Sequence, residues 1–206
     1  MTATALPDLA LRLPGSWWDV PLGDRDEARA SVRRLLRTRL GTSDERARGR
    51  IELERRLMAS LDQAIEGDGR SLQIALSIVP GARISMTAMI ATPELAIPHQ
   101  PDPSLTPLDV LALALERARG ADEAPAAKVP SRAGTALRRV RYRVTTADGS
   151  EETLRTAAFE YWFVAPGTRR AVVATFSVPA GALEDELGGL ADAIVAVSGW
   201  QEPAAA

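Results

Sequence analysis

The chain has 206 residues, of which 46% are hydrophobic and 25% are charged, and its formal net charge at pH 7 is −2. These values are average for a globular protein and predict a single domain over residues 1–206, with a core from about residue 11 to residue 200; they exclude a disordered or membrane-embedded class. The absence of cysteine excludes disulfides, thiol catalysis and thiolate metal sites, and the net charge gives the whole molecule no attraction for nucleic acid.

The N-terminal sequence MTATALPDLALRLPG is not typical of a signal peptide. It has no basic n-region, and Asp8, Arg12 and Pro14 interrupt its apolar residues. No stretch of the sequence approaches the roughly 18 apolar residues that a membrane-spanning helix needs. We therefore expect a cytoplasmic protein without a membrane span.

The region after the tryptophan pair Trp17–Trp18 predicts two helices. Asp24 and Glu27 have the spacing of a capping box, so the first helix should begin at Asp24 and end near Gly41. The second helix should begin after Thr42 and end at the sequence EGDG. Both carry apolar residues at helical spacing, namely Val32, Leu35, Leu36 and Leu40 in the first helix and Leu53, Leu57, Leu61 and Ile65 in the second.

The middle of the chain predicts two strands, a loop and a short helix. SLQIALSIV and ISMTAMIA are two apolar runs separated by a Pro-Gly turn, which indicates a pair of strands. The proline-rich sequence TPELAIPHQPDPSLTP predicts a surface loop before a short helix from about Pro107 to Ala118. A second loose connection, RGADEAPAAKVPSRAG, should follow that helix.

The last third predicts a three-stranded antiparallel meander followed by a helix. TALRRVRYRVTT alternates arginine with valine and tyrosine, ADGS supplies an Asp-Gly hairpin turn, and EETLRTAAFEYWFVA and RAVVATFSV supply the next two strands. The helix after Pro179 should bury one apolar face, although Gly188 and Gly189 weaken it by roughly 1 kcal/mol each relative to alanine. Its predicted buried residues are Leu183, Leu187, Leu190, Ile194 and Val197.

The order of these segments resembles that of the bacterial members of the PsbP-like family. The resemblance rests on LRLPGSWWDV, a central sheet, EYWFVAPGTRRAVVATFSV and a closing helix that ends AIVAVSGW. It implies an α+β fold, an α/β/α sandwich with a central, mainly antiparallel sheet, an N-terminal helical pair and a C-terminal amphipathic helix. Trp17 and Trp18, successive in a strand, would then point to opposite faces of the sheet and cover one helical layer each. The arginine-rich helical pair from Asp24 to Glu66 is longer than in that family.

Groups for the common catalytic chemistries are scarce in this sequence. His99 is the single histidine and lies in a proline-rich loop, so we expect an exposed loop residue. No P-loop, dinucleotide-binding or zinc motif occurs, so no cofactor and no metal are expected. Glu160 lies within a strand, and a two-residue Asp-Gly hairpin would place it on the same face as Arg139 and Arg141. We favour a cross-strand ion pair for Glu160 over a catalytic carboxylate.

The arginines are the main candidate binding residues. The chain has 24 arginines and one lysine, Lys128, a ratio that codon usage in a GC-rich genome also explains. One set recurs every four residues along the first helix and forms a stripe. Two sources of negative charge could compensate this stripe. One is an acidic partner protein, and the other is the set of acids on the second helix, namely Glu45, Glu52, Glu54, Asp62 and Glu66. The candidate partner-binding residues are Arg25, Arg29, Arg33 and Arg37 of the helix and Arg139, Arg141 and Arg143 of the strand.

These features together predict a non-enzymatic protein-binding or adaptor module whose partner has an acidic surface. Binding of nucleic acid or another polyanion through the same arginines is the alternative. It is less favoured because Tyr142, the aromatic residue between the strand arginines, lies on the opposite face from them. A carboxylate-based enzyme around Glu160 is the third interpretation.

Overall fold

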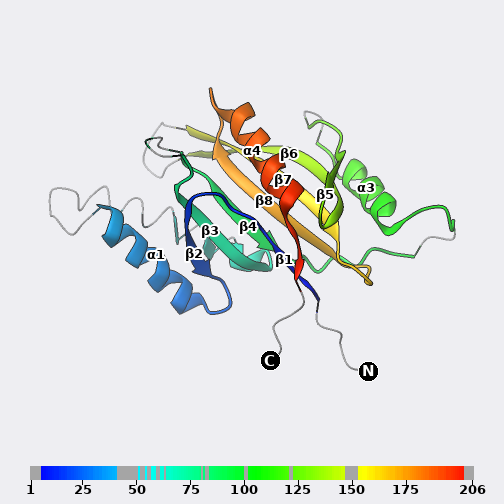
Figure 1. Ribbon diagram of the computed structural model, residues 1–206, viewed down its shortest axis with the longest axis horizontal. Coiled ribbons are helices and arrows are strands. Elements are labelled where there is room, and N and C mark those ends of the chain that lie inside the picture. Colours follow the sequence, from blue (N-terminus) through cyan, green and yellow to red (C-terminus); the bar gives the residue numbers. More distant parts are fainter. Residues whose placement is uncertain are drawn as a thin grey trace.

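The molecule is built on one large antiparallel β-sheet (Figure 1). The structure is a computed structural model, and it describes residues 6–40, 51, 54, 57, 58, 61, 62, 64–79, 81, 84–99, 102–120, 123–146 and 153–201. The sheet has seven strands in the order β2-β3-β4-β8-β7-β6-β5, and all neighbours are antiparallel. These strands are β2 (Ser16–Pro21), β3 (Gly69–Ser77), β4 (Thr87–Ala91), β5 (Ala127–Ser131), β6 (Gly134–Thr146), β7 (Thr153–Val164) and β8 (Ala171–Pro179).

The predicted strand pair and the predicted meander are both present. β3 and β4 correspond to the two apolar runs in the middle of the chain, and β6, β7 and β8 form the meander. A separate two-stranded sheet joins β1 (Asp8–Ala10) to β9 (Gly199–Gln201), so segments near the two ends of the described chain lie side by side. The mixed α and β composition with a large antiparallel sheet is therefore confirmed.

Three helices have complete bounds, and they are α1 (Arg25–Leu40), α3 (Pro107–Arg117) and α4 (Glu184–Val197). The first two, α1 and α3, begin where their sequences predict. Asp24 caps α1, because its Oδ1 accepts hydrogen bonds from the backbone N–H groups of Asp26 and Glu27 at 2.8 and 2.9 Å. None of the helices among the described residues has the length and apolarity needed to cross a membrane.

A second helical segment follows α1, and its described residues are 51, 54, 57, 58, 61, 62 and 64–66. Leu61 is buried against α1, with Leu57 and Ile65 partly buried beside it, as their four-residue spacing predicts. The predicted helix end at Gly41, the predicted start after Thr42 and the prediction for Leu53 lie outside the described residues, as does the side chain of Leu40.

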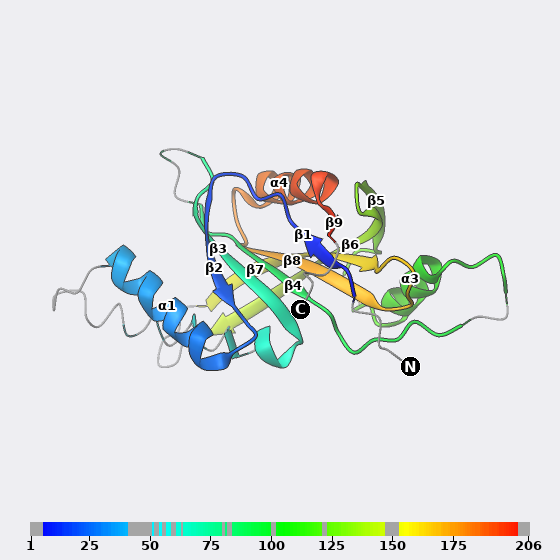
Figure 2. The ribbon, with the colours of Figure 1, turned by 60° about the horizontal axis from the view of Figure 1, so that its bottom comes forward.

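Helices contact both faces of the sheet. The face that carries Trp18 packs against α1 at the β2 end. The same face carries Leu137 and Trp162 at the other end, where α3 packs on it. The opposite face packs against α4, with Phe159 in the contact. Figure 2 shows α4 above the sheet and α1 below it.

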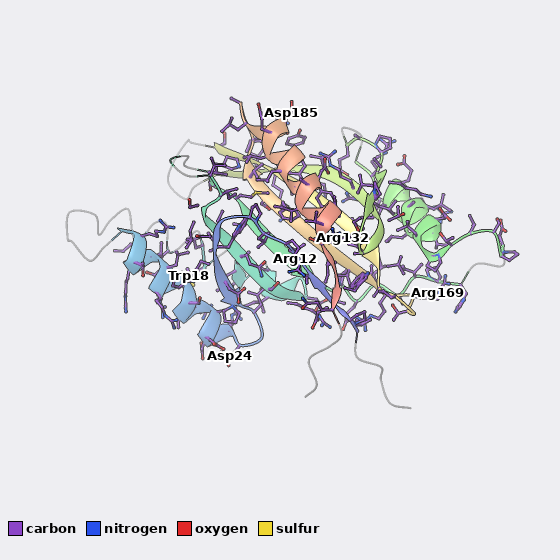
Figure 3. The ribbon with its side chains drawn as sticks, viewed as in Figure 1. Arg12, Trp18, Asp24, Arg132, Arg169 and Asp185 are labelled. Carbon is purple, nitrogen blue, oxygen red and sulfur yellow. The ribbon has the colours of Figure 1, made fainter. Side chains whose placement is uncertain are left out.

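The tryptophan pair divides between these two faces, as predicted. Trp17 packs in the cluster that includes α4, and its Nε1 donates to the carbonyl of Pro14 at 2.7 Å. Trp18 packs beside α1, where its Nε1 donates to Ser31 Oγ at 2.9 Å (Figure 3). The preceding Gly15 has a φ of 77°, and a Cβ there would lie 2.2 Å from the carbonyl oxygen of Ser77. The Pro-Gly step therefore brings the chain into β2 against β3.

The predicted buried face of α4 is wrong at two of its five positions. Leu183 and Val197 are exposed, whereas Leu187 and Ile194 are buried as expected. The complete buried set is Leu187, Gly188, Ala191, Ile194 and Val195. The small residues select this face because they allow close approach: a Cβ on Gly188 would lie 2.8 Å from Cε1 of Phe159.

Candidate functional site

The arginine stripe on α1 faces acids of the second helical segment. Arg25 Nη2 lies 2.8 Å from Asp62 Oδ1, and Arg29 Nη2 lies 3.2 Å from the same oxygen. Arg33 Nε lies 2.9 Å from Glu54 Oε1. The pairing with the second helix that the sequence offered is therefore present for these three arginines.

These ion pairs lie at the surface and remain in contact with solvent. The side chains of Arg25 and Arg33 are both about half exposed, so each pair contributes little to stability. The hydrogen bond from Arg25 holds the pKa of Asp62 below its usual value of 3.8, against the opposing effect of burial. Arg37 is exposed in the last turn of α1, and the candidate acids Glu45 and Glu52 lie outside the described residues.

The strand arginines occupy a different setting, on the sheet face that α3 covers. Arg139 stands directly opposite Glu160 in the β6–β7 register, and its Nε lies 3.4 Å from Glu160 Oε2. The side chains of Arg139 and Glu160 are only 7% and 9% exposed. The cross-strand ion pair predicted for Glu160 is therefore confirmed, and it is buried.

A second carboxylate, Glu123, lies at this position and was not predicted from the sequence. This residue lies in the connection between α3 and β5, and its Oε1 accepts a hydrogen bond from Arg141 Nε at 3.1 Å. Its Oε2 lies 3.8 Å from Arg139 Nε. No local pattern marks Glu123, because an acid in a proline- and alanine-rich connection is ordinary in sequence and the contact is made across 16 or more residues of chain.

The group formed by Glu123, Arg139, Arg141 and Glu160 is here called the four-charge cluster. Two guanidinium groups and two carboxylates make it formally neutral, as a buried charge group requires. Burial favours a higher pKa for Glu123, but a backbone hydrogen bond from Gly120 and the nearby arginines lower its pKa below the usual 4.5. Glu160 also accepts a hydrogen bond from Trp162 Nε1 at 3.1 Å.

The hydrogen bonding of the four-charge cluster is incomplete. Glu123 Oε2 and Arg139 Nε are both buried, and neither has a hydrogen-bond partner among the described atoms. A buried polar atom without a partner costs about 1–3 kcal/mol. The positive and negative charges of the cluster thus balance, but its hydrogen-bond donors and acceptors are not all paired.

The cluster adjoins an open sheet edge. β5 pairs with β6 only over Gly134–Arg138, and no strand in the described part of the chain pairs with the outer edge of β6 from Arg139 to Thr146. Arg143 is exposed on the cluster face. Tyr142 and Val144 are 46% and 66% exposed on the other face. In Figure 1 this end of β6 lies at the periphery of the sheet, near the start of α4.

Tyr142 is held in place by charged neighbours. The guanidinium of Arg155 lies 4.1 Å from its ring centroid, and its hydroxyl donates to Glu184 Oε1. The bond to Glu184 raises the pKa of Tyr142 above 10.0, with burial adding to the effect. The partly exposed aromatic ring is therefore held in place on the strand by Arg155 and Glu184.

Other candidate sites are poorer in polar groups. His99 is exposed, as expected, and the adjacent Asp102 and Ser104 bond to each other at 2.7 Å. No group of three or more metal-ligating side chains occurs within the described ranges. A cavity of about 280 Å³ lies between β1 and the sheet, beside the exposed ion pair of Arg70 with Asp8. This volume is just below the range of about 300–1,000 Å³ that is usual for ligand sites.

Comparison with known proteins adds no relative. No protein-family model, no curated protein and no solved structure matches this chain. The PsbP-like resemblance therefore stays a prediction, and the functional interpretation depends on the geometry of the site.

Proposed function

We propose that this chain is a non-enzymatic protein-binding module whose docking surface is the outer edge of β6 from Arg139 to Thr146. The observation that carries the proposal is the open edge of this strand, flanked by arginines on one face and by exposed Tyr142 and Val144 on the other. We call this surface the β6 edge.

An extended segment of a partner protein fits the β6 edge by adding a strand to the sheet. The unpaired backbone N–H and C=O groups of an edge strand provide the affinity in this mode of recognition, and alternate side chains provide the specificity. Acidic residues of the partner strand would meet Arg141 and Arg143. The alternate positions would be apolar and would cover Tyr142 and Val144.

The charges support the β6 edge over the arginine stripe of α1. Arg25, Arg29 and Arg33 already have acidic partners within the chain. Arg141 also has a partner within the chain, Glu123, whereas Arg143 is exposed, so Arg143 carries this difference. A protein partner is favoured over nucleic acid because the aromatic and the cationic groups of β6 lie on opposite faces.

A catalytic role for Glu160 is not favoured. Its carboxylate already accepts from Trp162 and pairs with Arg139, and Glu160 does not line the cavity between β1 and the sheet. A general acid or base needs access to a substrate proton.

We also propose that the fold is an α/β/α sandwich of the PsbP-like type. The packing of α1 and α3 on one face of the sheet and of α4 on the other supports this interpretation. The fold by itself says nothing of the partner.

Site-specific photocrosslinking in a native extract tests the proposed function. A photoreactive amino acid replaces Val144 on the β6 edge or, as the control position, the exposed Val79 after β3. The probe at position 144 should give a defined adduct that maps to an extended acidic segment of the partner. Arg143→Glu should reduce its yield by about fivefold, because loss of an exposed ion pair is worth up to roughly 1 kcal/mol. Arg37→Glu, the same charge change on α1, should leave the yield unchanged.

Three results would contradict the proposal. The first is equal adduct yield at positions 144 and 79, and the second is a yield at position 144 that Arg143→Glu does not reduce. The third is an adduct that nuclease treatment removes, which would favour the polyanion alternative.

A further inference from the structure

The two carboxylates of the four-charge cluster are held differently. Glu160 belongs to a central strand of the meander, and both its position in the register and its hydrogen bond from Trp162 fix it. Glu123 comes from a connection outside the sheet, where its carboxylate is held by hydrogen bonds from Arg141 and from the backbone of Gly120. Glu123 is therefore the replaceable member of the cluster.

We infer that Arg139 and Arg141 form a carboxylate-binding site which Glu123 fills from within the chain, and that an acidic side chain of the partner strand displaces Glu123. The inference rests on the proposed function for the source of the incoming carboxylate. The existence of the site depends only on the cluster itself.

The charge of the cluster defines the ligand. Without the Glu123 carboxylate, the guanidinium groups of buried Arg139 and half-exposed Arg141 face the single carboxylate of Glu160, which leaves one positive charge uncompensated. A singly charged anion restores neutrality, whereas a doubly charged phosphate would leave an excess negative charge. The planar fork of a guanidinium also matches the two oxygens of a carboxylate.

The geometry shows why Glu123 can be displaced. Its Oε2 stays 3.8 Å from Arg139 Nε, and both atoms are buried without a hydrogen-bond partner. The backbone of Glu123 is tied to its own connection, since its N–H donates to Gly120 and its carbonyl accepts from Arg119. A carboxylate without this tether can approach both arginines closely and satisfy the unpartnered Nε.

Access to the site lies on the same side as the β6 edge. Arg139 is buried, but Arg141 is 41% exposed and stands next to the exposed Arg143 on that face of the strand. A partner strand paired with β6 would carry an acid past Arg141. Exchange of Glu123 for that acid would then accompany docking and release the connection between α3 and β5 from the sheet.

Acetate provides a test that needs no partner. Thermal unfolding of Glu123→Ala is compared in sodium acetate and in sodium chloride at equal ionic strength. Acetate should fill the vacated position and raise the unfolding temperature by about 3 °C relative to chloride. The wild type should show no such difference. Glu116→Ala should also show no difference between acetate and chloride. It is the matched control, because it removes a carboxylate from the last turn of α3 that pairs with Arg119 at 2.8 Å.

An equal effect of acetate on all three proteins, or no effect on Glu123→Ala, would overturn the site. An equal effect of phosphate would overturn its preference for carboxylate.

If Glu123→Ala does not fold, Glu123→Gln is used instead, because its amide oxygen can still accept a hydrogen bond from Arg141. The side-chain Nε–H resonance of Arg141 should then shift saturably at a lower acetate concentration than in the wild type, and an unchanged midpoint would overturn the site.

A second experiment, with the partner present, tests whether the incoming carboxylate belongs to a protein or to a small free molecule. In Glu123→Ala, the carboxylate that competes with the partner for the two arginines is gone. The adduct yield of the photoreactive probe at position 144 should therefore rise by about threefold or more, because one competing ion pair is lost. An acetate effect without this gain would overturn displacement by the partner. Absence of any adduct, together with a clear acetate effect, would contradict the proposed function and leave the site itself supported.

Discussion

At the residue scale, Asp109 shows how one side chain serves both a helix end and a tertiary contact. It completes the capping box of α3, because Thr106 donates to it through its backbone N–H and the Asp109 N–H donates to Thr106 Oγ1. Asp109 Oδ1 also accepts from Lys128 Nζ on β5 at 2.8 Å. The hydrogen bond from Lys128 is the largest cause that lowers the pKa of Asp109 to about 2, with Thr106 adding to it.

A pH dependence follows from this lowered pKa. The Asp109 carboxylate stabilises the folded state at pH values above its unfolded pKa of about 3.8, and that contribution is lost as the pH falls through about 2. Asp109→Asn removes the contribution at every pH. The free energy of unfolding, measured by urea titration, should therefore fall less between pH 4 and pH 2 (roughly the window of this titration) in Asp109→Asn than in the wild type. Glu94→Gln, in an exposed loop, is the control, and an equal fall in Asp109→Asn and wild type would refute the role of Asp109.

At the scale of the element, α4 shows that helical spacing predicts an apolar side but not the line of closest contact. Leu183, Leu187, Leu190, Ile194 and Val197 share one side by spacing, yet the buried line is rotated towards Gly188 and Ala191. Close packing on Phe159 favours small residues over large ones at that line. The two adjacent glycines consequently have different roles.

Alanine substitution separates these roles. Gly189 has no atom within 4 Å of an added Cβ, so Gly189→Ala should raise the free energy of unfolding by about 1 kcal/mol through helix propensity. Gly188→Ala should lower it by about 1–3 kcal/mol, because the added Cβ overlaps the buried ring of Phe159. Chemical denaturation measures both variants. A stabilising Gly188→Ala would mean that the ring moves aside at no cost.

At the scale of the whole molecule, the balance of 25 basic and 27 acidic residues hides how the charges are distributed. Three arginines of α1 are compensated by the second helical segment, and two of β6 are compensated in the four-charge cluster. The positive charge of these five arginines is therefore compensated within the fold.

Removal of the compensating acids should expose this surface. The double variant Glu54→Gln/Asp62→Asn frees the guanidinium groups of Arg25, Arg29 and Arg33. It should elute from a heparin column at a higher salt concentration than the wild type, since a cluster of guanidinium groups without acidic neighbours attracts a polyanion more strongly. The control Glu94→Gln/Asp185→Asn changes the net charge equally at two exposed acids elsewhere. Equal retention of the two double variants would show that net charge alone decides.

Much of the local architecture was predictable from the sequence, since it depends on contacts between near neighbours. The Asp24 cap follows from the spacing of Asp24 and Glu27, and the alternation of β6 and the opposite directions of Trp17 and Trp18 follow from strand periodicity. The common face of Glu160 with Arg139 and Arg141, and hence a cross-strand ion pair, was also predictable. A two-residue hairpin at Asp-Gly would have placed Ala158 opposite Arg139, and the observed shift of two residues keeps the same face.

The sequence by itself thus determined most of the elements and the faces on which charged residues lie, because φ/ψ preferences and side-chain periodicity act within a few residues. The prediction of a loose connection over RGADEAPAAKVPSRAG was wrong where β5 (Ala127–Ser131) forms, because that strand depends on pairing with β6. Only the tertiary structure decided which arginines are paired, which line of α4 is buried, and that Glu123 reaches the sheet from a distant connection. It also decided that β5 stops short and leaves the β6 edge open. These features depend on contacts between segments far apart in the chain, which packing selects and no local pattern specifies.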